Sequence, residues 1–149
     1  MKPVITWIII ADGARARVLE HAGPGKGLHE VSGLERKQTP LRNADIVSDK
    51  PGRSMASVGY GRSAMEPPSD PAARREADFI GNIAVLLDEK LKKGAFDRLI
   101  LAAAPQALGD LRKSISPQLQ QKVMAEVSKD LTHIPNTDIG KHFEDVLAV

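Results

Sequence analysis

Residues 6–11 read TWIIIA, and this run decides the fold of the chain. It is rich in β-branched residues and continuously apolar, which is typical of a central strand buried on both faces of a sheet. Asp12-Gly13 follows directly and is a strong two-residue signal for a hairpin turn. Residues 14–19, ARARVL, then alternate small or apolar with charged side chains, as a half-exposed strand does. The sequence therefore predicts a β-hairpin whose first strand is buried.

The remaining elements alternate between strands and helices. Residues 28–34 supply a third, weaker strand, and residues 98–104, RLILAAA, predict another buried strand. Pro71 begins the clearest helix, because Ser69 or Asp70 can cap it and proline suits the first helical position. Apolar residues at spacings of three and four give this helix one buried stripe, and Gly94 ends it. The stripe consists of Ala77, Ile80, Ala84, Leu87 and Leu91. Further helices are predicted for residues 105–113, 117–131 and 138–147.

The helix predicted for residues 117–131 rests on a spacing of four between its apolar residues, Leu119, Val123, Val127 and Leu131. Taken together, the order of elements predicts an α/β fold. We expect a single domain over residues 1–149, with a mixed sheet of three or four strands and helices on one or both faces. A long basic Gly/Pro-rich loop is predicted for residues 36–70.

Composition limits the classes of function. The 149 residues are 42% hydrophobic and 27% charged, which is ordinary for a soluble globular protein. No cysteine is present, so disulfides and thiolate chemistry are excluded. The apolar run at residues 4–10 is too short for a signal-peptide core, and no segment reaches the roughly 20 apolar residues of a membrane span. We therefore expect a cytoplasmic protein without a membrane partner.

The segment 36–75 carries most of the basic charge. Its forty residues hold eight Lys and Arg against four Asp and Glu, a net charge of +4, whereas the whole chain has +2. Loops longer than about 12–15 residues are uncommon in compact domains and are usually functional or disordered. A basic loop on a near-neutral body favours an anionic partner, of which nucleic acid is the commonest. A disordered insertion without any partner is the alternative.

Within this segment, arginine directly follows glycine at Gly52-Arg53 and Gly61-Arg62, a pattern suited to phosphate binding. Arginine offers a planar fork to phosphate oxygens, and glycine lets a backbone approach a ligand closely. The predicted RNA- and phosphate-binding residues are Lys50, Gly52, Arg53, Gly59, Tyr60, Gly61, Arg62, Arg74 and Arg75. Aromatic residues make up only 3% of the chain, so a surface of stacked bases is not expected.

Other motifs give weaker signals. GPGKG at residues 23–27 lacks the spacing and hydroxyl of a phosphate-binding P-loop, and a plain turn explains it better. The four histidines, at positions 21, 29, 133 and 142, show no local metal-ligand spacing. The serines of the long segment lack a nucleophile-elbow motif. We therefore expect no metal and no cofactor.

Two further features have both a structural and a functional interpretation. Asp12, at the end of the first strand, either caps the tight turn or serves as a functional carboxylate, and the turn is favoured. Arg15 and Arg17 share one strand face, where they either extend a phosphate-binding surface or form a solvated edge.

Five segments in order resemble the bacterial host attachment protein family: WIIIADGARARVLE, SDKPGR, GYGRSAMEP with SDP, FDRLILAAAPQALGDLRKSIS, and KDLTHIPN. The resemblance covers residues 6–142, and the family name implies a role in attachment to host cells. The layout is also similar to the catalytic middle domain of archaeal and eukaryotic peptide release factors. In that domain a basic loop carries Gly-Gly-Gln at its tip, whereas this chain has Gly59-Tyr60-Gly61-Arg62 in the corresponding place.

The resemblance to release factors implies docking to the ribosome or to tRNA, and the missing Gly-Gly-Gln implies that release chemistry is lost. Our first hypothesis is thus a translation-associated module that binds ribosomal RNA or tRNA without catalysis. The second is a host-interaction protein that acts at the cell surface or indirectly. The third is a hydrolase on an RNA-linked ester, for which Asp12, Glu66 and His133 are the first candidates.

Overall fold

Strand β1 (Thr6–Ala11) lies inside a six-stranded mixed sheet, with a strand paired to each of its edges. The structure is a computed structural model, and it describes residues 3–39 and 70–147. The other strands are β2 (Arg15–His21), β3 (His29–Glu30), β4 (Arg36–Lys37), β5 (Arg98–Ala103) and β6 (Val123–Val127). The helices are α3 (Pro71–Lys92), α4 (Pro105–Ser114), α5 (Pro117–Gln120) and the 3-10 helix η2 (Ile139–Phe143).

The strand order is β3-β2-β1-β5-β6, with β4 also paired to β2. β1 and β2 form the predicted antiparallel hairpin, in which Ala11 lies opposite Ala16. β5 lies parallel to β1 on its other edge, and β6 lies parallel to β5. The α/β fold with a mixed sheet, predicted from the sequence, is confirmed. Because β1, β5 and β6 run in the same direction, their carboxyl ends meet at one edge of the sheet.

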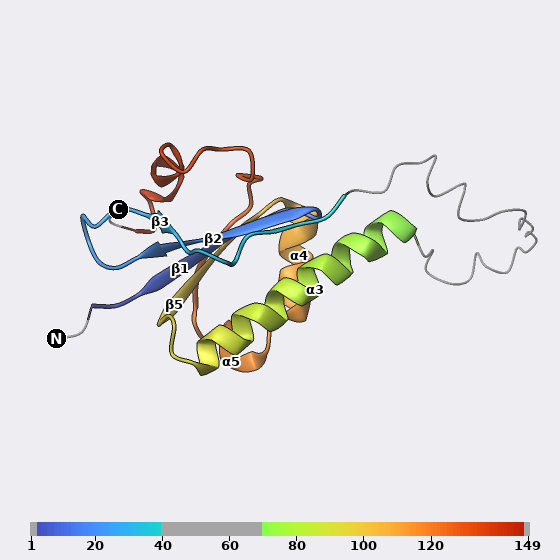
Figure 1. Cartoon of the computed structure of the whole chain (residues 1–149), viewed down its shortest axis with the longest axis horizontal. Coiled ribbons are helices and arrows are strands. Elements are labelled where there is room, and N and C mark those ends of the chain that lie inside the picture. Colours follow the sequence, from blue (N-terminus) through green and yellow to red (C-terminus); the bar gives the residue numbers. More distant parts are fainter. Residues whose placement is uncertain (1–2, 40–69, 148–149) are drawn as a thin grey trace, which may run out of the picture.

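Side chains of β1 alternate between two apolar cores. Trp7 and Ile9 pack with α3 and α4 on one face of the sheet. Ile8 and Ile10 pack on the other face with residues of the C-terminal segment, among them Phe143. Figure 1 shows α3 and α4 on one side of the sheet and the red C-terminal segment on the other. All six residues of β1 are buried, as the continuous apolar run predicts.

Helix α3 begins as predicted. The side chain of Asp70 accepts hydrogen bonds from the backbone N–H groups of Ala72 and Ala73, and Pro71 occupies the first turn. This arrangement satisfies two of the N–H groups that have no partner within the helix. The helix ends at Lys92, just before Gly94, whose φ of +74° suits glycine. Its buried face includes Phe79 and Ile83 besides three residues of the predicted stripe, Ile80, Ala84 and Leu87.

The helix predicted for residues 117–131 is wrong. α5 ends at Gln120, and Val123–Val127 forms strand β6 at the edge of the sheet. A spacing of four is also a multiple of two, so Val123 and Val127 share one face of a strand as readily as one face of a helix. In β6 they point to the half-buried side, whereas Met124 is exposed. Backbone pairing with β5 makes this segment a strand, with a period of two, rather than a helix.

Two other predicted elements are longer than the elements that the structure shows. Of residues 138–147, only Ile139–Phe143 is helical, and it is a 3-10 helix for which Asp138 provides no side-chain cap. The weak strand predicted for residues 28–34 shrinks to β3, because Gly33 has a φ of +82° that turns the chain. The chain then pairs again with β2 through β4, which the sequence did not predict.

Of the helices in residues 3–39 and 70–147, none has the length and apolar character that crossing a membrane requires.

The C-terminal segment should be an essential part of the core. Phe143 is fully buried against the second face of the sheet, so Phe143→Ala should lower the free energy of unfolding by about 3–5 kcal/mol. Val85→Ala is the control, since Val85 is 59% exposed on α3 and should change stability by no more than about 0.5 kcal/mol. Urea unfolding measures both. Equal, small effects would show that the segment does not cover this face.

Candidate functional site

The carboxyl end of β1 runs into a tight turn that Asp12 holds. Its Oδ1 accepts hydrogen bonds from the backbone N–H groups of Ala14 and Arg15, both at 2.8 Å. The structural interpretation of Asp12 as a turn cap is therefore confirmed. The other oxygen, Oδ2, lies within hydrogen-bond distance of the hydroxyl of Thr132, at 3.2 Å. Asp12 thus connects the hairpin turn to a segment more than a hundred residues later.

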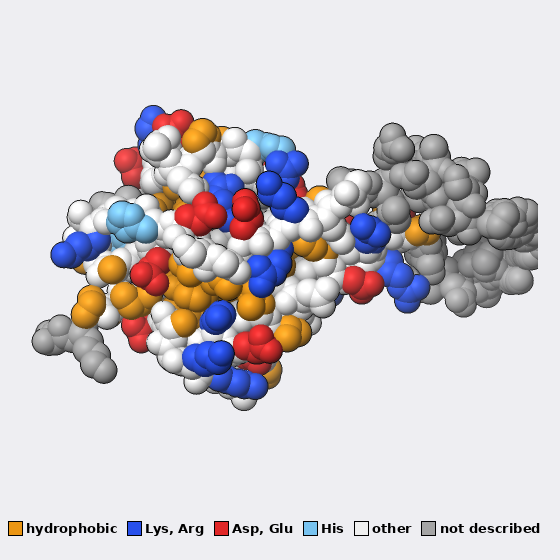
Figure 2. Space-filling view, viewed as in Figure 1, with side chains coloured by type: hydrophobic (Ala, Val, Ile, Leu, Met, Phe, Trp, Pro, Cys, Tyr) orange, Lys and Arg blue, Asp and Glu red, His pale blue; other side chains and the backbone are white. Residues whose placement is uncertain are grey.

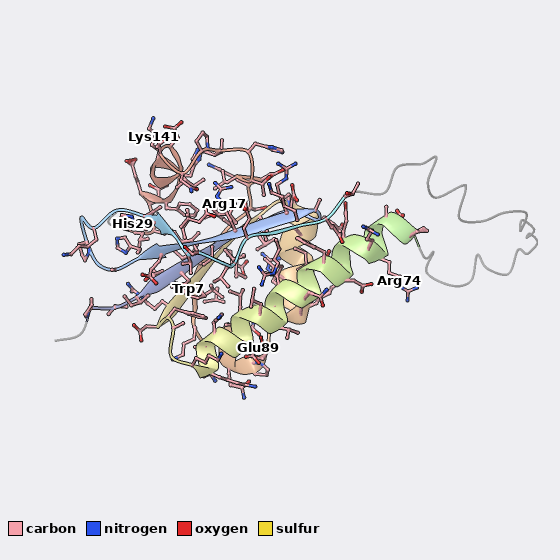
Figure 3. The ribbon with its side chains drawn as sticks, viewed as in Figure 1. Trp7, Arg17, His29, Arg74, Glu89 and Lys141 are labelled. Carbon is pink, nitrogen blue, oxygen red and sulfur yellow. The ribbon has the colours of Figure 1, made fainter. Side chains whose placement is uncertain are left out.

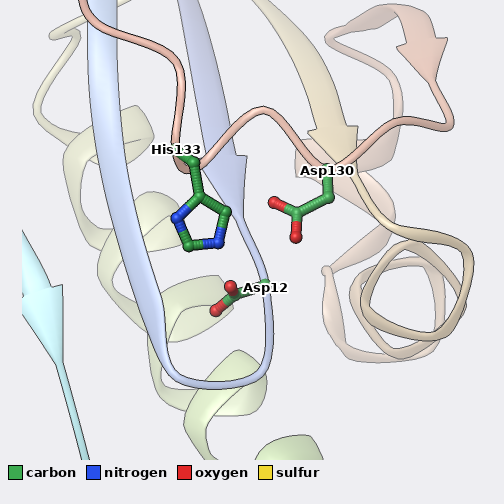
Figure 4. Close-up of side chains that lie close together, drawn as sticks. All are labelled: Asp12, Asp130 and His133. Atoms are coloured by element: carbon green, nitrogen blue, oxygen red, sulfur yellow. The ribbon is translucent and has the colours of Figure 1, made fainter.

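That later segment follows β6 and brings Asp130, Thr132 and His133 to the same place. The hydroxyl of Thr132 donates to Asp130 Oδ1 at 2.6 Å, and its backbone N–H donates to the same atom at 3.0 Å. Carboxylate oxygens of Asp12 and Asp130 and a ring nitrogen of His133 all lie within 4.8 Å of one another. Figure 4 shows the three side chains facing a common point. We call Asp12, Asp130 and His133 the Asp-Asp-His cluster.

The topology explains why these residues meet. β1 and β6 both end at the carboxyl edge of the sheet, and Asp12 and Asp130 follow shortly after these ends. Functional groups in α/β sheets commonly gather at this edge. The sequence had drawn attention to Asp12 and His133 but missed Asp130, because residues 117–131 were predicted to be one helix. Glu66, the third candidate for hydrolysis, lies outside the described residues.

Arg15 supplies positive charge beside the Asp-Asp-His cluster. Its Nε lies 3.8 Å from Asp12 Oδ2, and its side chain is 45% exposed. A terminal guanidinium nitrogen lies 3.4 Å from Nδ1 of His133. Partial burial alone would raise the pKa of Asp130, but the hydrogen bonds from Thr132 and the charges of His133 and Arg15 outweigh it and lower that pKa. Asp130 is therefore ionised at neutral pH.

Arg17 has a different role from Arg15. Its Nε donates to Asn136 Oδ1 at 2.9 Å, and its two terminal nitrogens donate to the backbone carbonyls of Thr132 and Ile134, at 3.0 and 2.5 Å. Figure 3 shows Arg17 between the sheet and the C-terminal segment. Since its donors serve this segment, Arg17 is neither a solvated edge residue nor a free phosphate ligand. It holds the backbone next to His133 in place.

Both described ends of the long segment are fixed at the hairpin turn. The side-chain amide of Gln38 donates to the carbonyls of Gly13 at 3.1 Å and Arg75 at 3.3 Å. A Cβ on Gly13 would lie only 2.5 Å from side-chain carbons of Glu76, so the turn packs closely on α3. Arg15 pairs with Lys37 across β2 and β4. The chain therefore leaves the described structure beside the hairpin turn, and α3 passes the same turn at Arg75 and Glu76.

Most of the predicted basic charge lies at these two ends. Of the net +4 in residues 36–75, a net +3 comes from Arg36, Lys37, Arg74 and Arg75 together with Asp70. All five are exposed, and Figures 2 and 3 show basic side chains, including Arg74, at this end of the molecule. The other predicted phosphate-binding residues lie outside the described residues: Lys50, Gly52, Arg53, Gly59, Tyr60, Gly61 and Arg62.

Two hollows of different character lie at opposite ends of the sheet. One, of about 320 Å³, adjoins the turn and is lined by Asp12, Arg15, Glu76, Asp110 and five further residues. The other, of about 510 Å³, lies at the amino ends of β1 and β5 and is lined largely by apolar residues that include Val4, Met124 and Leu147. The hollow at the carboxyl edge is therefore mostly acidic, with Arg15 as the one cation among the described residues that line it, so exposed cations that suit an anionic ligand lie beside it rather than in it.

Arg17 should be sensitive even to a conservative change. Arg17→Lys keeps the charge, but a lysine cannot donate to all three acceptors. The free energy of unfolding should therefore fall by about 1–3 kcal/mol. The control, Arg98→Lys, changes an exposed arginine at the start of β5 and should be close to neutral. Thermal unfolding followed by circular dichroism compares them. If Arg17→Lys is as stable as the control, Arg17 does not anchor the C-terminal segment.

Comparisons with known proteins identify the family. Residues 7–143 match the family described as "Protein required for attachment to host cells", as the sequence motifs predicted. A search of curated proteins gave no match.

Solved structures show only a distant likeness. One, titled "Archaeal protein", is 13% identical with a TM-score of 0.47 and covers 97% of this chain and 36% of its own. The archaeal translation termination factor aRF1 is 12% identical with a TM-score of 0.48 and covers 95% of this chain and 37% of its own. The PPX-GPPA enzyme of Aquifex aeolicus is 11% identical with a TM-score of 0.38, covering 83% and 36%.

This chain therefore spans about 36–37% of the length of each of these three structures. At TM-scores below 0.5 these likenesses carry no argument about function. The family match extends over nearly all of the sequence. The chain therefore belongs to the family of proteins required for attachment to host cells.

Proposed function

We propose that this protein is a cytoplasmic, translation-associated module that binds ribosomal RNA or tRNA at the carboxyl edge of its sheet. The ends of the long segment supply phosphate contacts there through Lys37, Arg74 and Arg75. Lys50, Arg53 and Arg62 add further contacts, with Gly52, Gly59 and Gly61 allowing close approach and Tyr60 available to a base. No catalytic step belongs to this proposal.

One observation carries it. Gln38 donates hydrogen bonds both to the hairpin turn and to the backbone of Arg75 in α3, which brings the chain on the two sides of the long segment, with its exposed cations, to one end of the molecule. Phosphate contacts provide most of the affinity of RNA- and DNA-binding proteins, and they need exposed Lys and Arg side chains held close together. Arg74 and Arg75 also stand near the amino end of a helix, where cations oppose the dipole. A bound anion would offset that cost.

The family description favours a second candidate function, contact with a host cell. RNA binding accounts for attachment indirectly, because a protein that acts in translation changes which surface proteins a bacterium makes. Direct contact would require the protein outside the cell. The two functions differ in whether ribosomes bind the purified protein.

The experiment is cosedimentation with ribosomes across a salt series. Binding should weaken as salt rises, and replacing Lys37, Arg74 and Arg75 by Ala should make the slope of log K against log salt shallower by about 2–3, since each lost phosphate contact removes roughly 0.7–0.9. The double variant Arg53→Ala/Arg62→Ala should reduce the slope by about 1–2 on the same basis.

The matched control replaces Lys26, Lys92 and Lys93 by Ala, which removes the same charge from exposed positions away from the carboxyl edge. Its slope should stay near that of the unaltered protein. An equal decrease of the slope in the control would show that the effect depends on net charge alone. It would refute binding at the carboxyl edge. The absence of binding at every salt concentration would refute the proposal and place host contact first.

A further inference from the structure

The Asp-Asp-His cluster combines the donor atoms of a metal site, drawn from distant parts of the chain. Asp12 comes from the β1–β2 turn, whereas Asp130 and His133 follow β6. One ligand atom from each lies within 4.8 Å of the others. We propose that these three residues bind a divalent first-row transition metal ion, with Mn²⁺ or Zn²⁺ as the best matches. This site goes beyond the proposed function and does not depend on RNA binding.

The donor set selects the class of metal. Imidazole nitrogen suits transition metals, and carboxylate oxygen suits harder ions such as Mn²⁺, so the mixture favours ions that accept both. Ca²⁺ takes six to eight oxygen ligands and Mg²⁺ a near-ideal oxygen octahedron, which three side chains including a histidine do not supply. Three protein ligands leave coordination positions open. The adjoining hollow, which Asp12 and Arg15 line but Asp130 and His133 do not, leaves room for water on the Asp12 side of the cluster.

Hydrogen bonds from the surrounding residues already orient the two carboxylates. Oδ1 of Asp12 is held by the backbone of the turn, which leaves Oδ2 facing the cluster. The Thr132 hydroxyl lies 2.6 Å from Asp130 Oδ1 and 3.2 Å from Asp12 Oδ2. Its one hydrogen serves one of these oxygens at a time, and a neutral donor leaves both carboxylates negatively charged. Such fixed outer contacts are typical of metal sites. Two carboxylates close together also need a cation nearby.

Arg15 provides that cation in the structure described here, and it competes with a metal. Its guanidinium lies 3.8 Å from Asp12 Oδ2 and donates toward Nδ1 of His133. If Nε2 of a neutral imidazole binds metal, Nδ1 carries the hydrogen and can no longer accept from Arg15. Arg15 must then turn outward, which its exposed side chain permits. Removing Arg15 should therefore strengthen metal binding, whereas an ordinary ion-pair cluster gains no metal affinity.

Mn²⁺ titration of the purified protein, followed by electron paramagnetic resonance, tests the site. Free aqueous Mn²⁺ gives a strong signal that falls on binding. Asp12→Asn, Asp130→Asn and His133→Gln should each weaken binding about tenfold or more, on the scale seen when metal-site contacts are removed. Arg15→Gln should bind several-fold more tightly than the unaltered protein. Competition with a chromophoric chelator gives the same comparison for Zn²⁺.

His29→Gln is the control, since His29 is exposed on β3 and hydrogen-bonds the Lys26 carbonyl away from the cluster. It should leave metal binding unchanged. Thermal unfolding in the presence of chelator checks that each variant is folded. If one ligand variant does not fold, the other two ligand variants test the site. Metal binding that survives in all three ligand variants would place the ion elsewhere and overturn the proposal. So would the absence of Mn²⁺ and Zn²⁺ binding in both the unaltered protein and Arg15→Gln.

Ribosome cosedimentation in the presence of chelator separates this inference from the proposed function. The two claims fail independently, because RNA binding rests on exposed cations and the metal site on carboxylates and imidazole. A protein that binds Mn²⁺ but no ribosome would keep the metal site alone.

Discussion

The complete burial of β1 is the constraint on which the rest of the structure depends. Its six residues are covered on both faces and hydrogen-bonded to a strand along each edge. An apolar strand of this kind gains stability only if two layers pack on it, roughly 25 cal/mol for each Å² of apolar surface removed from water. Helices α3 and α4 form one layer, and the C-terminal segment around Phe143 forms the other. The candidate functional site lies at the edge of the sheet where this buried strand ends.

At that edge, segments distant in sequence hold one another by polar contacts. Asp12 caps the turn, and its carboxylate lies within hydrogen-bond distance of the Thr132 hydroxyl. Arg17 donates hydrogen bonds to the backbone carbonyls of Thr132 and Ile134 and so holds that backbone in place. Gln38 fixes the turn to α3. Each of these side chains makes hydrogen bonds that hold the fold together. What remains exposed is a set of charges of both signs, with Arg15 between the carboxylates and the basic segment ends.

The sequence predicts the parts of the fold that have a single strong period. The run TWIIIA, the hairpin at Asp12-Gly13 and the proline-initiated helix at Pro71 all occur as expected. Prediction failed where two periods coincide, as at Val123 and Val127, and where a short 3-10 helix follows no regular pattern, as at Ile139–Phe143. Only the pairing with β5 distinguishes strand from helix there. Such pairing is a property of the tertiary structure.

The candidate site shows the same division. Arg74 and Arg75 were predicted from charge alone, and the structure gives them exposed positions at the start of α3. Asp130 was missed because its importance comes from standing beyond a parallel strand that the sequence did not reveal. Arg17 appeared to share the role of Arg15, since alternation in a strand says which face a side chain occupies but not what packs over it.

The central claim is that the carboxyl edge, rather than the apolar hollow at the other end, is the binding surface. An amide-resolved NMR titration with tRNA tests it most directly. We expect chemical-shift changes at residues 12–15, 37–38, 70–76 and 130–133 that diminish as salt is added. Changes confined to the neighbourhood of Val4 and Met124, or spread evenly over the surface, would contradict it.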